Sequence, residues 1–385
     1  MLFMSTKLLI CDDSNMARKQ LARSLPDGWD VDVSFATNGV EGVAAIKEGK
    51  GDVLLLDLNM PEMDGYQVLE AILKQDLPTL TIVVSGDIQP EAHKRVTSLG
   101  ALDFIQKPVN KEKLTEVLLA YGVFTKADQQ SIVEADIAAE SVEVAEQSPI
   151  TEPKVEQPAK DNPSIDTPLS PQTPQVETSD VSNEAPLTLS SDLRDCYQEV
   201  SNVAMGRAGD LLARLLNVFV ELPIPNVNFI EVSELSMALR DVESNESTSG
   251  ICQGFISAGI SGEALLILND SSFKDVASLM NYQYAENEGT ELELLMDLSN
   301  VLIGACLKGF SEQLDIDFSQ GHPVVLGQHR KISELVANNA NKWAKTLAIE
   351  ISYSIENYPI KCDLLLLFTE HSMIALNNKL MYLIE

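Results

Sequence analysis

Polar side chains in the first 122 residues stand at the ends of short apolar runs. The runs and the residues that end them are 8–11 with Asp12 and Asp13, 53–56 with Asp57, 81–84 with Ser85, and 103–105 with Lys107. Apolar runs that alternate with helix-like stretches indicate a parallel sheet covered on both faces. The carboxyl ends of such strands meet at one edge of the sheet, where ligands bind. We therefore expect these five side chains to lie together.

Three carboxylates at one sheet edge would repel each other strongly. A hard divalent cation relieves that repulsion, and Mg²⁺ suits one or two carboxylates completed by waters and a phosphoryl oxygen. A lysine and a hydroxyl beside the metal could hold two further phosphoryl oxygens. This set suits transfer of a phosphoryl group onto a carboxylate, which we assign to Asp57. A single strand-end Asp is more often a loop cap, but five matching positions in order favour a site.

The same residues resemble the receiver domain of bacterial response regulators of the CheY type over residues 6–122. The likeness is carried by Asp12-Asp13, Asp57-Leu58-Asn59-Met60-Pro61, Asp64-Gly65, Ser85 and Lys107-Pro108. It implies a flavodoxin-like, doubly wound α/β fold with five strands, a histidine kinase as phosphodonor and Asp57 as phosphoacceptor. It also implies Mg²⁺ held by Asp13, Asp57 and the backbone carbonyl of Asn59, with Asp12 acting through water. A last implied property is a switch in which Ser85 and Phe104 move when phosphate arrives.

A second group of polar residues follows residue 190. Asp195, Glu199 and Asn202 are spaced i, i+4 and i+7, which places them on one face of a helix. The opposite face is apolar and can pack on a core, so we expect an exposed polar stripe. This stripe has no nucleophile, but an acid can pair with a lysine of a partner and a carboxamide can orient water. The spacing recurs about 98 residues later in a second stripe, formed by Glu293, Asp297 and Asn300.

Other features of this region repeat together with the stripe. Ser-Glu-Leu stands at 233–235 and again at 333–335. Each half also contains a pair of strand-like runs, at 254–257 with 264–268 and at 347–354 with 363–368. A period of about 98 residues predicts an α+β domain with an internal pseudo-twofold repeat, divided into about 190–285 and 286–385.

The stripes resemble the signature of the CheC/CheX/FliY family of chemotaxis phosphatases: Asp or Ser, three residues, Glu, two residues, Asn. The likeness covers about residues 190–385, and the first copy matches fully, with the following Gly206. The second copy departs, and its Asp297 reaches about 1.3 Å less far than a Glu. Carried over, the family's roles make Glu199 the anchor to a receiver lysine and Asn202 the water-orienting group. Asp297 and Asn300 are the corresponding second pair.

Residues 123–189 differ in composition from both neighbours. They contain no glycine, and 149–186 holds eight of the seventeen prolines. Such a segment buries too little apolar surface to offset chain entropy, so we expect a disordered, acidic, Pro-rich linker, with room for a short helix at 128–146. The predicted order is a receiver at 1–122, a linker at 123–189 and a CheC-like domain at 190–385.

The formal net charge of −31 bears on the class of partner. Such acidity disfavours a nucleic-acid backbone or an anionic membrane surface as the main partner. No uninterrupted apolar run approaches the roughly 18 residues that span a bilayer. The five cysteines are widely spaced and show no CxxC pattern, which indicates reduced thiols. We therefore expect a cytoplasmic protein that binds neither nucleic acid nor membrane.

Two functions fit these patterns. The leading one is a phosphorylation-regulated two-component or chemotaxis protein that hydrolyses the aspartyl phosphate of a CheY-like receiver, in trans or its own. A linker of this length, with an r.m.s. span of about 50 Å, permits the second arrangement. The alternative is a receiver-controlled, non-enzymatic module that docks on a CheD-like, chemotaxis or flagellar-motor protein. A transcription factor is disfavoured, because the second domain is acidic and has no basic recognition helix.

Overall fold

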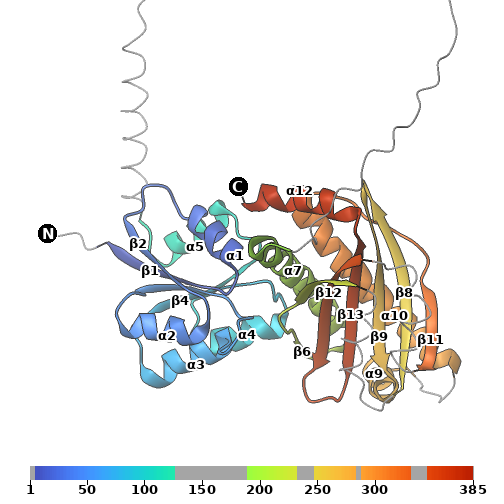
Figure 1. The fold of residues 1–385 in the computed structure, drawn as a ribbon. Coiled ribbons are helices and arrows are strands. Elements are labelled where there is room, and N and C mark those ends of the chain that lie inside the picture. Colours follow the sequence, from blue (N-terminus) through green and yellow to red (C-terminus); the bar gives the residue numbers. More distant parts are fainter. Residues whose placement is uncertain (1–4, 126–188, 232–246, 283–287, 331–344, 385) are drawn as a thin grey trace, which may run out of the picture.

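The computed structural model describes residues 5–125, 189–231, 247–282, 288–330 and 345–384. These residues form two domains that lie side by side, with one long helix, α7 (Ser191–Leu216), between their sheets (Figure 1). The predicted helix at 128–146 and both Ser-Glu-Leu triplets lie outside the described residues, as does nearly all of the predicted linker.

The first domain is a doubly wound parallel α/β fold, as predicted. Its strand order is β2-β1-β3-β4-β5, and every neighbouring pair is parallel. The central strand β3 is buried along its whole length because helices cover both faces of the sheet. Its elements are β1 (Thr6–Cys11), α1 (Asn15–Arg23), β2 (Val31–Ala36), α2 (Gly39–Lys47), β3 (Val53–Leu56), α3 (Gly65–Gln75), β4 (Leu80–Ser85), α4 (Pro90–Ser98), β5 (Asp103–Gln106) and α5 (Lys111–Ala120).

Polar loop residues after the strands also start the helices. Ser14 caps α1 by accepting a hydrogen bond from the Ala17 N–H, at 3.1 Å. Asp64 caps α3 through a reciprocal pair of bonds with Gln67. A Cβ on Gly65 would lie 2.4 Å from the Asp57 carbonyl oxygen, so only glycine lets α3 begin against the Asp57 loop. The caps thus hold the loops that carry the predicted site residues.

The packed part of the first domain extends past residue 122. Phe124, which the composition places in the linker, is 1% exposed and packs on Trp29, with ring centroids 6.0 Å apart. Tyr121, Gly122 and Val123 continue from α5 through turn hydrogen bonds to its last carbonyls. The predicted start of the linker at 123 is therefore too early, and the packed domain continues through Phe124. The composition of the residues after Phe124 led to the earlier boundary, but the buried ring of Phe124 belongs to the core of the first domain.

The second domain is an α+β unit built on an eight-stranded antiparallel sheet. The sheet order is β10-β8-β9-β13-β12-β6, with β11 also on β8 and β7 also on β12. Its two long hairpins, β8–β9 and β12–β13, meet at the central β9–β13 pair. Besides α7, its elements are β6 (Val220–Glu221), β7 (Asn226–Glu231), β8 (Thr248–Ser257), β9 (Ile260–Asn269), η1 (Asp270–Ser272), α9 (Phe273–Leu279), α10 (Glu288–Leu314), β10 (Ser319–Gln320), β11 (Val324–Arg330), β12 (Lys345–Ile355), β13 (Lys361–Thr369) and α12 (Ser372–Ile384).

Helices α7 and α10 pack against each other and share one apolar core with the sheet. The two helices approach closely at Gly309, where a Cβ would lie 2.6 Å from the Cα of Ala204. By length and composition α10 could cross a membrane, but 67% of that stretch is buried inside the fold, as in a core helix. The close α7–α10 contact holds α7 in place, and α7 carries the first polar stripe.

Replacing Gly309 with Ala should destabilise the second domain, because α7 and α10 would have to separate. We expect the free energy of unfolding, measured in urea, to fall by about 1–3 kcal/mol. The matched control is Gly304→Ala on the same helix, where no described atom lies within 4 Å of the new Cβ. This control should gain roughly 0.5–1 kcal/mol, because alanine has the higher helix propensity. Equal unfolding midpoints for the two variants would contradict the close contact.

Candidate functional site

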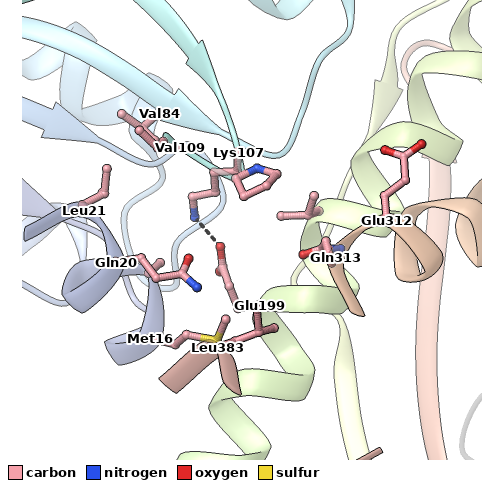
Figure 2. Close-up of a pocket in the computed structure, with 13 residues that line it drawn as sticks. Met16, Gln20, Leu21, Val84, Lys107, Val109, Glu199, Glu312, Gln313 and Leu383 are labelled. Atoms are coloured by element: carbon pink, nitrogen blue, oxygen red, sulfur yellow. Dashed lines mark ion pairs between the residues drawn. The ribbon is translucent and has the colours of Figure 1, made fainter. Parts of the chain in front are cut away.

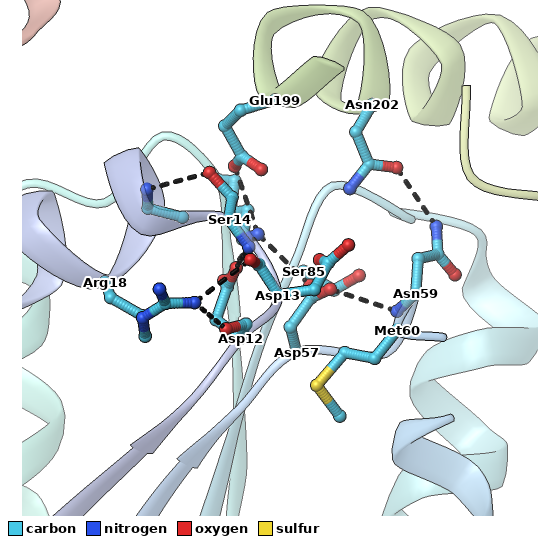
Figure 3. Close-up of polar contacts among 12 residues, drawn as sticks. Asp12, Asp13, Ser14, Arg18, Asp57, Asn59, Met60, Ser85, Glu199 and Asn202 are labelled. Carbon is cyan, nitrogen blue, oxygen red and sulfur yellow. Dashed lines mark hydrogen bonds and ion pairs between the residues drawn. The ribbon is translucent and has the colours of Figure 1, made fainter. Parts of the chain in front are cut away.

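The three predicted carboxylates meet at the carboxyl ends of β1 and β3. Asp12, Asp13 and Asp57 each offer a ligand oxygen within 4.8 Å of the others. The loop that carries the first two is held from behind by Arg18, whose Nη1 donates to the backbone carbonyls of Asp12 and Asp13 at 2.6 and 3.0 Å. The Ser14 N–H donates to Asp12 Oδ1 at 2.9 Å. These contacts fix the carboxylates in a single cluster (Figure 3).

Lys107, just after β5, is the cation of the cluster. Its ammonium lies 2.8 Å from Asp12 Oδ2, 3.2 Å from Asp57 Oδ1 and 3.1 Å from Glu199 Oε1. Burial alone would lower the pKa of Lys107, but these carboxylates outweigh it and hold that pKa well above its usual value. Glu199 belongs to α7 of the second domain, so one ammonium joins carboxylates of both domains.

The cluster carries more negative than positive charge. Four buried or half-buried carboxylates surround the single ammonium, and burial, with the charges of Asp12 and Asp57, raises the pKa of Asp13 to about 7. Burial likewise raises the pKa of Asp57 and of Glu199, against the pull of Lys107. Apart from their contacts with the ammonium, Asp12 Oδ2 and Asp57 Oδ1 have no hydrogen-bond partner among the described residues. Excess charge and carboxylate oxygens with spare lone pairs at one point fit a hard divalent cation such as Mg²⁺.

The other predicted receiver residues surround this cluster to different degrees. The Asn59 N–H donates to Asp57 Oδ2 at 3.1 Å. Ser85, at the end of β4, is fully buried, and its hydroxyl accepts from the Asp87 N–H at 3.1 Å. Phe104 on β5 is half-buried and contacts the His93 ring, with centroids 5.7 Å apart. The Asn59 backbone thus joins the cluster, the Ser85 hydroxyl holds the loop after β4, and the ring of Phe104 packs on α4.

The first stripe of α7 is buried, contrary to the expectation of an exposed face. Glu199 and Asn202 are 5% and 6% exposed, because the first domain docks directly on them. The Asn202 Oδ1 accepts from Asn59 Nδ2 at 3.2 Å, and its amide nitrogen faces the space above Asp57 (Figure 3). Asp195, the third member, accepts the Asn15 and Met16 N–H groups at 3.1 and 2.8 Å. The spacing predicted the shared face correctly but not what covers it.

Two glycines make this docking close. A Cβ on Gly206 would lie 1.9 Å from the carbonyl oxygen of Gly86, and a Cβ on Gly86 would lie 3.1 Å from the Cα of Val203. The loop after β4 and the α7 backbone are therefore in direct contact, which no residue with a side chain at position 206 permits. The glycine that follows the first stripe is thus a docking residue.

The second stripe lies on α10, outside this site. Asn300 and Glu293 are exposed, and Asp297 is half-buried, where it accepts the Tyr282 hydroxyl at 2.8 Å. Gly304, four residues after Asn300, has no described atom within 4 Å of its missing Cβ. The structure therefore brings Glu199 and Asn202 to the carboxylate cluster but not Asp297 and Asn300.

A small cavity lies beside the Lys107–Glu199 pair (Figure 2). Its volume is about 130 Å³. Apart from the ion pair it is lined mainly by apolar side chains of α1, the β5–α5 loop and α12, among them Met16, Val109 and Leu383. At roughly 30 Å³ for each water, this space has room for a few molecules beside Glu199.

Some contributors could not be found from the sequence. Arg18 and Gly86 act through backbone contacts, with loop carbonyls and with α7, and residue type and spacing do not mark such contacts. Asp195 was recognised by its spacing, but its hydrogen bonds to the first turn of α1 depend on how the domains meet. The sequence offers one signal for the Gly86 contact. Gly86 directly follows Ser85, which was predicted as a phosphoryl-site residue, and a glycine at the start of that loop permits close approach of another backbone.

Comparison with known proteins identifies the first domain. The family model for the response regulator receiver domain matches residues 8–119. The chemotaxis protein CheY of Listeria monocytogenes is 36% identical over 112 residues, which is 29% of this chain and 94% of that protein. A protein-glutamate methylesterase/protein-glutamine glutaminase of Geobacter sulfurreducens is 37% identical over 113 residues. That match spans 28% of this chain and only 30% of the methylesterase.

Two solved structures are similar in part. FliY of Thermotoga maritima is 17% identical, with a TM-score of 0.39, and the match covers 51% of this chain and 99% of that chain. A chain of the CheX–CheY–BeF3–Mg complex of Borrelia burgdorferi is 29% identical, with a TM-score of 0.29. That match covers 31% of this chain and 90% of the other. The receiver assignment rests on the family model and the sequence relatives, and it agrees with the carboxylate cluster in the parallel fold. Through its first domain the chain belongs to the response regulator receiver family.

Proposed function

We propose that the second domain is a CheC-like phosphatase that hydrolyses receiver aspartyl phosphate, and that the Asp57 phosphate of the same chain is the substrate of the first stripe. One observation carries the proposal: Glu199 pairs with Lys107 at 3.1 Å while the amide of Asn202 stands over Asp57. An acid and an amide, delivered together to a phosphoryl-acceptor pocket, are the groups needed to anchor a receiver and orient a water.

The phosphoryl group would come from a histidine kinase and be held in the carboxylate cluster. Asp12, Asp13, Asp57 and the backbone of Asn59 would hold Mg²⁺, which when bound offsets the negative charge that gathers on the phosphoryl oxygens. Lys107 and the Ser85 hydroxyl would contact two further phosphoryl oxygens. These residues stabilise charge and fix geometry, which is most of what catalysis of phosphoryl transfer requires.

Hydrolysis then needs a water in line with the bond to be broken. The water oxygen forms a bond to phosphorus, and the bond from phosphorus to the Asp57 oxygen breaks, so that the carboxylate leaves with the electron pair. One water proton stays on the released phosphate and the other passes to solvent. The Asn202 amide donates to and accepts from this water, and Asn59 steadies the amide through its 3.2 Å bond to Asn202 Oδ1. Glu199 keeps α7 on the receiver by its pair with Lys107.

The organisation of the second domain supports a duplicated, CheC-like unit. Each half begins with a long helix that carries a stripe and continues into a long hairpin, and the two hairpins meet at β9–β13. Exchange of the two halves, β7 with β11, β8 with β12 and β9 with β13, leaves the strand pairing unchanged. We infer that the second stripe acts on a separate CheY-like receiver, because Asn300 is exposed and Gly304 offers the open backbone that Gly206 offers to the docked receiver.

The alternative is a module that only docks on a CheD-like or motor protein under receiver control. Docking alone would be served by the Lys107–Glu199 pair and the glycine contact. Docking alone gives no reason for the Asn202 carboxamide beside Asp57. The hydrogen-bond partner of this carboxamide among the described residues is a second carboxamide, that of Asn59. Asn202 is therefore the residue that separates the two functions.

Replacing Asn202 with Ala should slow loss of phosphate from Asp57, because the attacking water loses its orienting group. We expect the first-order rate, measured in Mg²⁺ on the phosphorylated full chain, to fall on the order of 10²-fold. Asn300→Ala is the matched control and should leave this rate unchanged while slowing hydrolysis of a separate phosphorylated CheY-type protein. The decisive variant carries Asn202→Ala and Asn300→Ala together. If it hydrolyses both the Asp57 phosphate and the phosphate of the separate CheY-type protein at wild-type rates, the chain is not a phosphatase.

Replacing Gly206 with Val should separate the domains without touching the chemistry. The new side chain would meet the Gly86 carbonyl, whose oxygen lies 1.9 Å from the point that a Cβ would occupy, so docking is lost. Amide hydrogen exchange along 199–206 should rise, and the rate of Asp57 phosphate loss should fall toward that of Asn202→Ala. Gly304→Val, at the open position on α10, is the control and should change neither readout. Protection of 199–206 that persists in Gly206→Val would contradict direct docking.

Removing the Asp13 carboxylate should weaken Mg²⁺ binding. Asp13→Asn is expected to lower the affinity at least roughly tenfold, since even changes behind metal ligands cost that much. Isothermal titration of the full chain with Mg²⁺ measures the change. Asp103→Asn is the control, because Asp103 begins β5 at the opposite edge of the sheet. Equal affinities for the two variants would exclude Asp13 as a ligand.

A further inference from the structure

Receiver helix α4 makes contacts with the second domain that lie outside the phosphoryl pocket. Gln89, the residue before α4, is 1% exposed and reaches the backbone of Val220 on β6. Its Nε2 donates to the Val220 carbonyl at 2.8 Å, and its Oε1 accepts the Val220 N–H at 2.9 Å. One side-chain amide thus satisfies both backbone groups of a strand residue, as a neighbouring strand would.

The orientation of this amide is fixed by the receiver itself. Gln89 Nε2 also donates to Asp87 Oδ1 at 3.1 Å, and the Gln89 N–H donates to the same oxygen at 3.1 Å. A carboxylate only accepts, so the nitrogen must face Asp87 and the oxygen must face the Val220 N–H. The receiver's own Asp87 thus sets the orientation in which the amide meets Val220.

The β6 strand explains why this contact matters. Val220 pairs with Ile355 of β12 on one side, and β6 stands at the end of that sheet path. Without Gln89, the outward N–H and carbonyl of fully buried Val220 would be left without partners in the interface. Unpaired buried backbone groups are costly. Docking at β6 is therefore favourable for a receiver whose side chain can pair with both backbone groups of Val220, as the Gln89 amide does.

Arg95, which is half-buried on α4, makes the second contact. Its Nη1 and Nη2 donate to the two carboxylate oxygens of Glu356 at 2.9 and 2.6 Å. Its guanidinium carbon lies 3.9 Å from the centre of the Phe219 ring. A two-point pair over an aromatic ring depends on a planar guanidinium, which lysine does not offer.

The charges of the two domains allow the Arg95–Glu356 pair to distinguish one receiver from another. Residues 1–122 hold 18 acids and 12 bases and 191–385 hold 27 and 12, so two acidic domains must meet. The receiver places Lys107 on Glu199 and Arg95 on Glu356. Lys107 belongs to the receiver motif and is expected in any CheY-type receiver. Gln89 and Arg95 do not belong to it, so they can distinguish one receiver from another.

We propose that Gln89 and Arg95 are specificity-determining residues that select this chain's own receiver as the substrate of the Glu199/Asn202 site. The inference rests on the proposed phosphatase function. The pocket contacts recognise a phosphorylated receiver in general, whereas the α4 contacts with Val220, Phe219 and Glu356 recognise this one. A receiver with an acid at position 95 would meet Glu356 with like charge and be rejected.

The test uses full-length chains that carry Gln89→Ala and Arg95→Glu together. Loss of phosphate from the chain's own Asp57 should slow roughly tenfold, because the docked fraction falls. Hydrolysis of a separate phosphorylated CheY-type receiver, which lacks Gln and Arg at these positions, should hold or rise, because α7 is no longer covered. Adding Glu356→Arg should restore part of the rate on Asp57. Lys74→Glu on α3, which pairs with Glu70 alone among the described ion pairs, is the charge-matched control and should change neither rate.

The outcomes separate this inference from the proposed function. A wild-type rate on Asp57 in the Gln89→Ala/Arg95→Glu chain, with Asn202→Ala still slow, overturns the selection and leaves the phosphatase standing. A fall in both rates without rescue by Glu356→Arg also overturns it, because it indicates general damage. An unchanged rate in Asn202→Ala removes the phosphatase itself, whatever the α4 variants do.

Discussion

The buried ammonium of Lys107 is the interaction on which the rest of this arrangement depends. It lies within 3.2 Å of carboxylates that follow β1 and β3 and of one on α7, so it belongs at once to the carboxylate cluster and to the domain interface. Burial of Glu199 in its charged form depends on this pairing, since an unpaired buried carboxylate is costly. The electrostatics of the carboxylate cluster and the position of α7 are therefore linked through one side chain.

Helix α7 can serve both domains because two of its faces are buried. Val200, Ala204 and Ala208 pack in the core of the second domain, while Glu199, Asn202 and Gly206 face the receiver. The contact with α10 at Gly309 holds the helix from behind. A site on such a helix is positioned by a domain core rather than by a loop, which suits a reaction whose catalysis is mostly placement.

The sequence predicted the parts whose cause is local. Strand-end carboxylates and helix-face spacing follow from the geometry of single elements, so Asp12, Asp57, Glu199 and Asn202 could be named in advance. β2 was harder to recognise, because only one of its six residues is fully buried and it lacks the apolar run of β1 and β3. The stripe was expected to be exposed, and the contacts of Gly206, Gln89 and Arg95 were not expected at all. Their burial arises only when two distant segments meet, and the spacing within one segment does not contain that information.

Under the proposed function, the docked arrangement also separates the gain of phosphate from its loss. Asp57 is 1% exposed beneath α7, and a kinase histidine must come within bonding distance of that carboxylate to transfer its phosphoryl group. The two domains therefore have to part for phosphorylation and meet again for hydrolysis. The same contacts that place Asn202 over Asp57 cover that carboxylate. In the proposed cycle, the strength of docking therefore sets both how fast Asp57 gains phosphate and how fast it loses phosphate. Contacts on α4, away from the pocket, can tune this balance without altering a residue that touches the phosphoryl group.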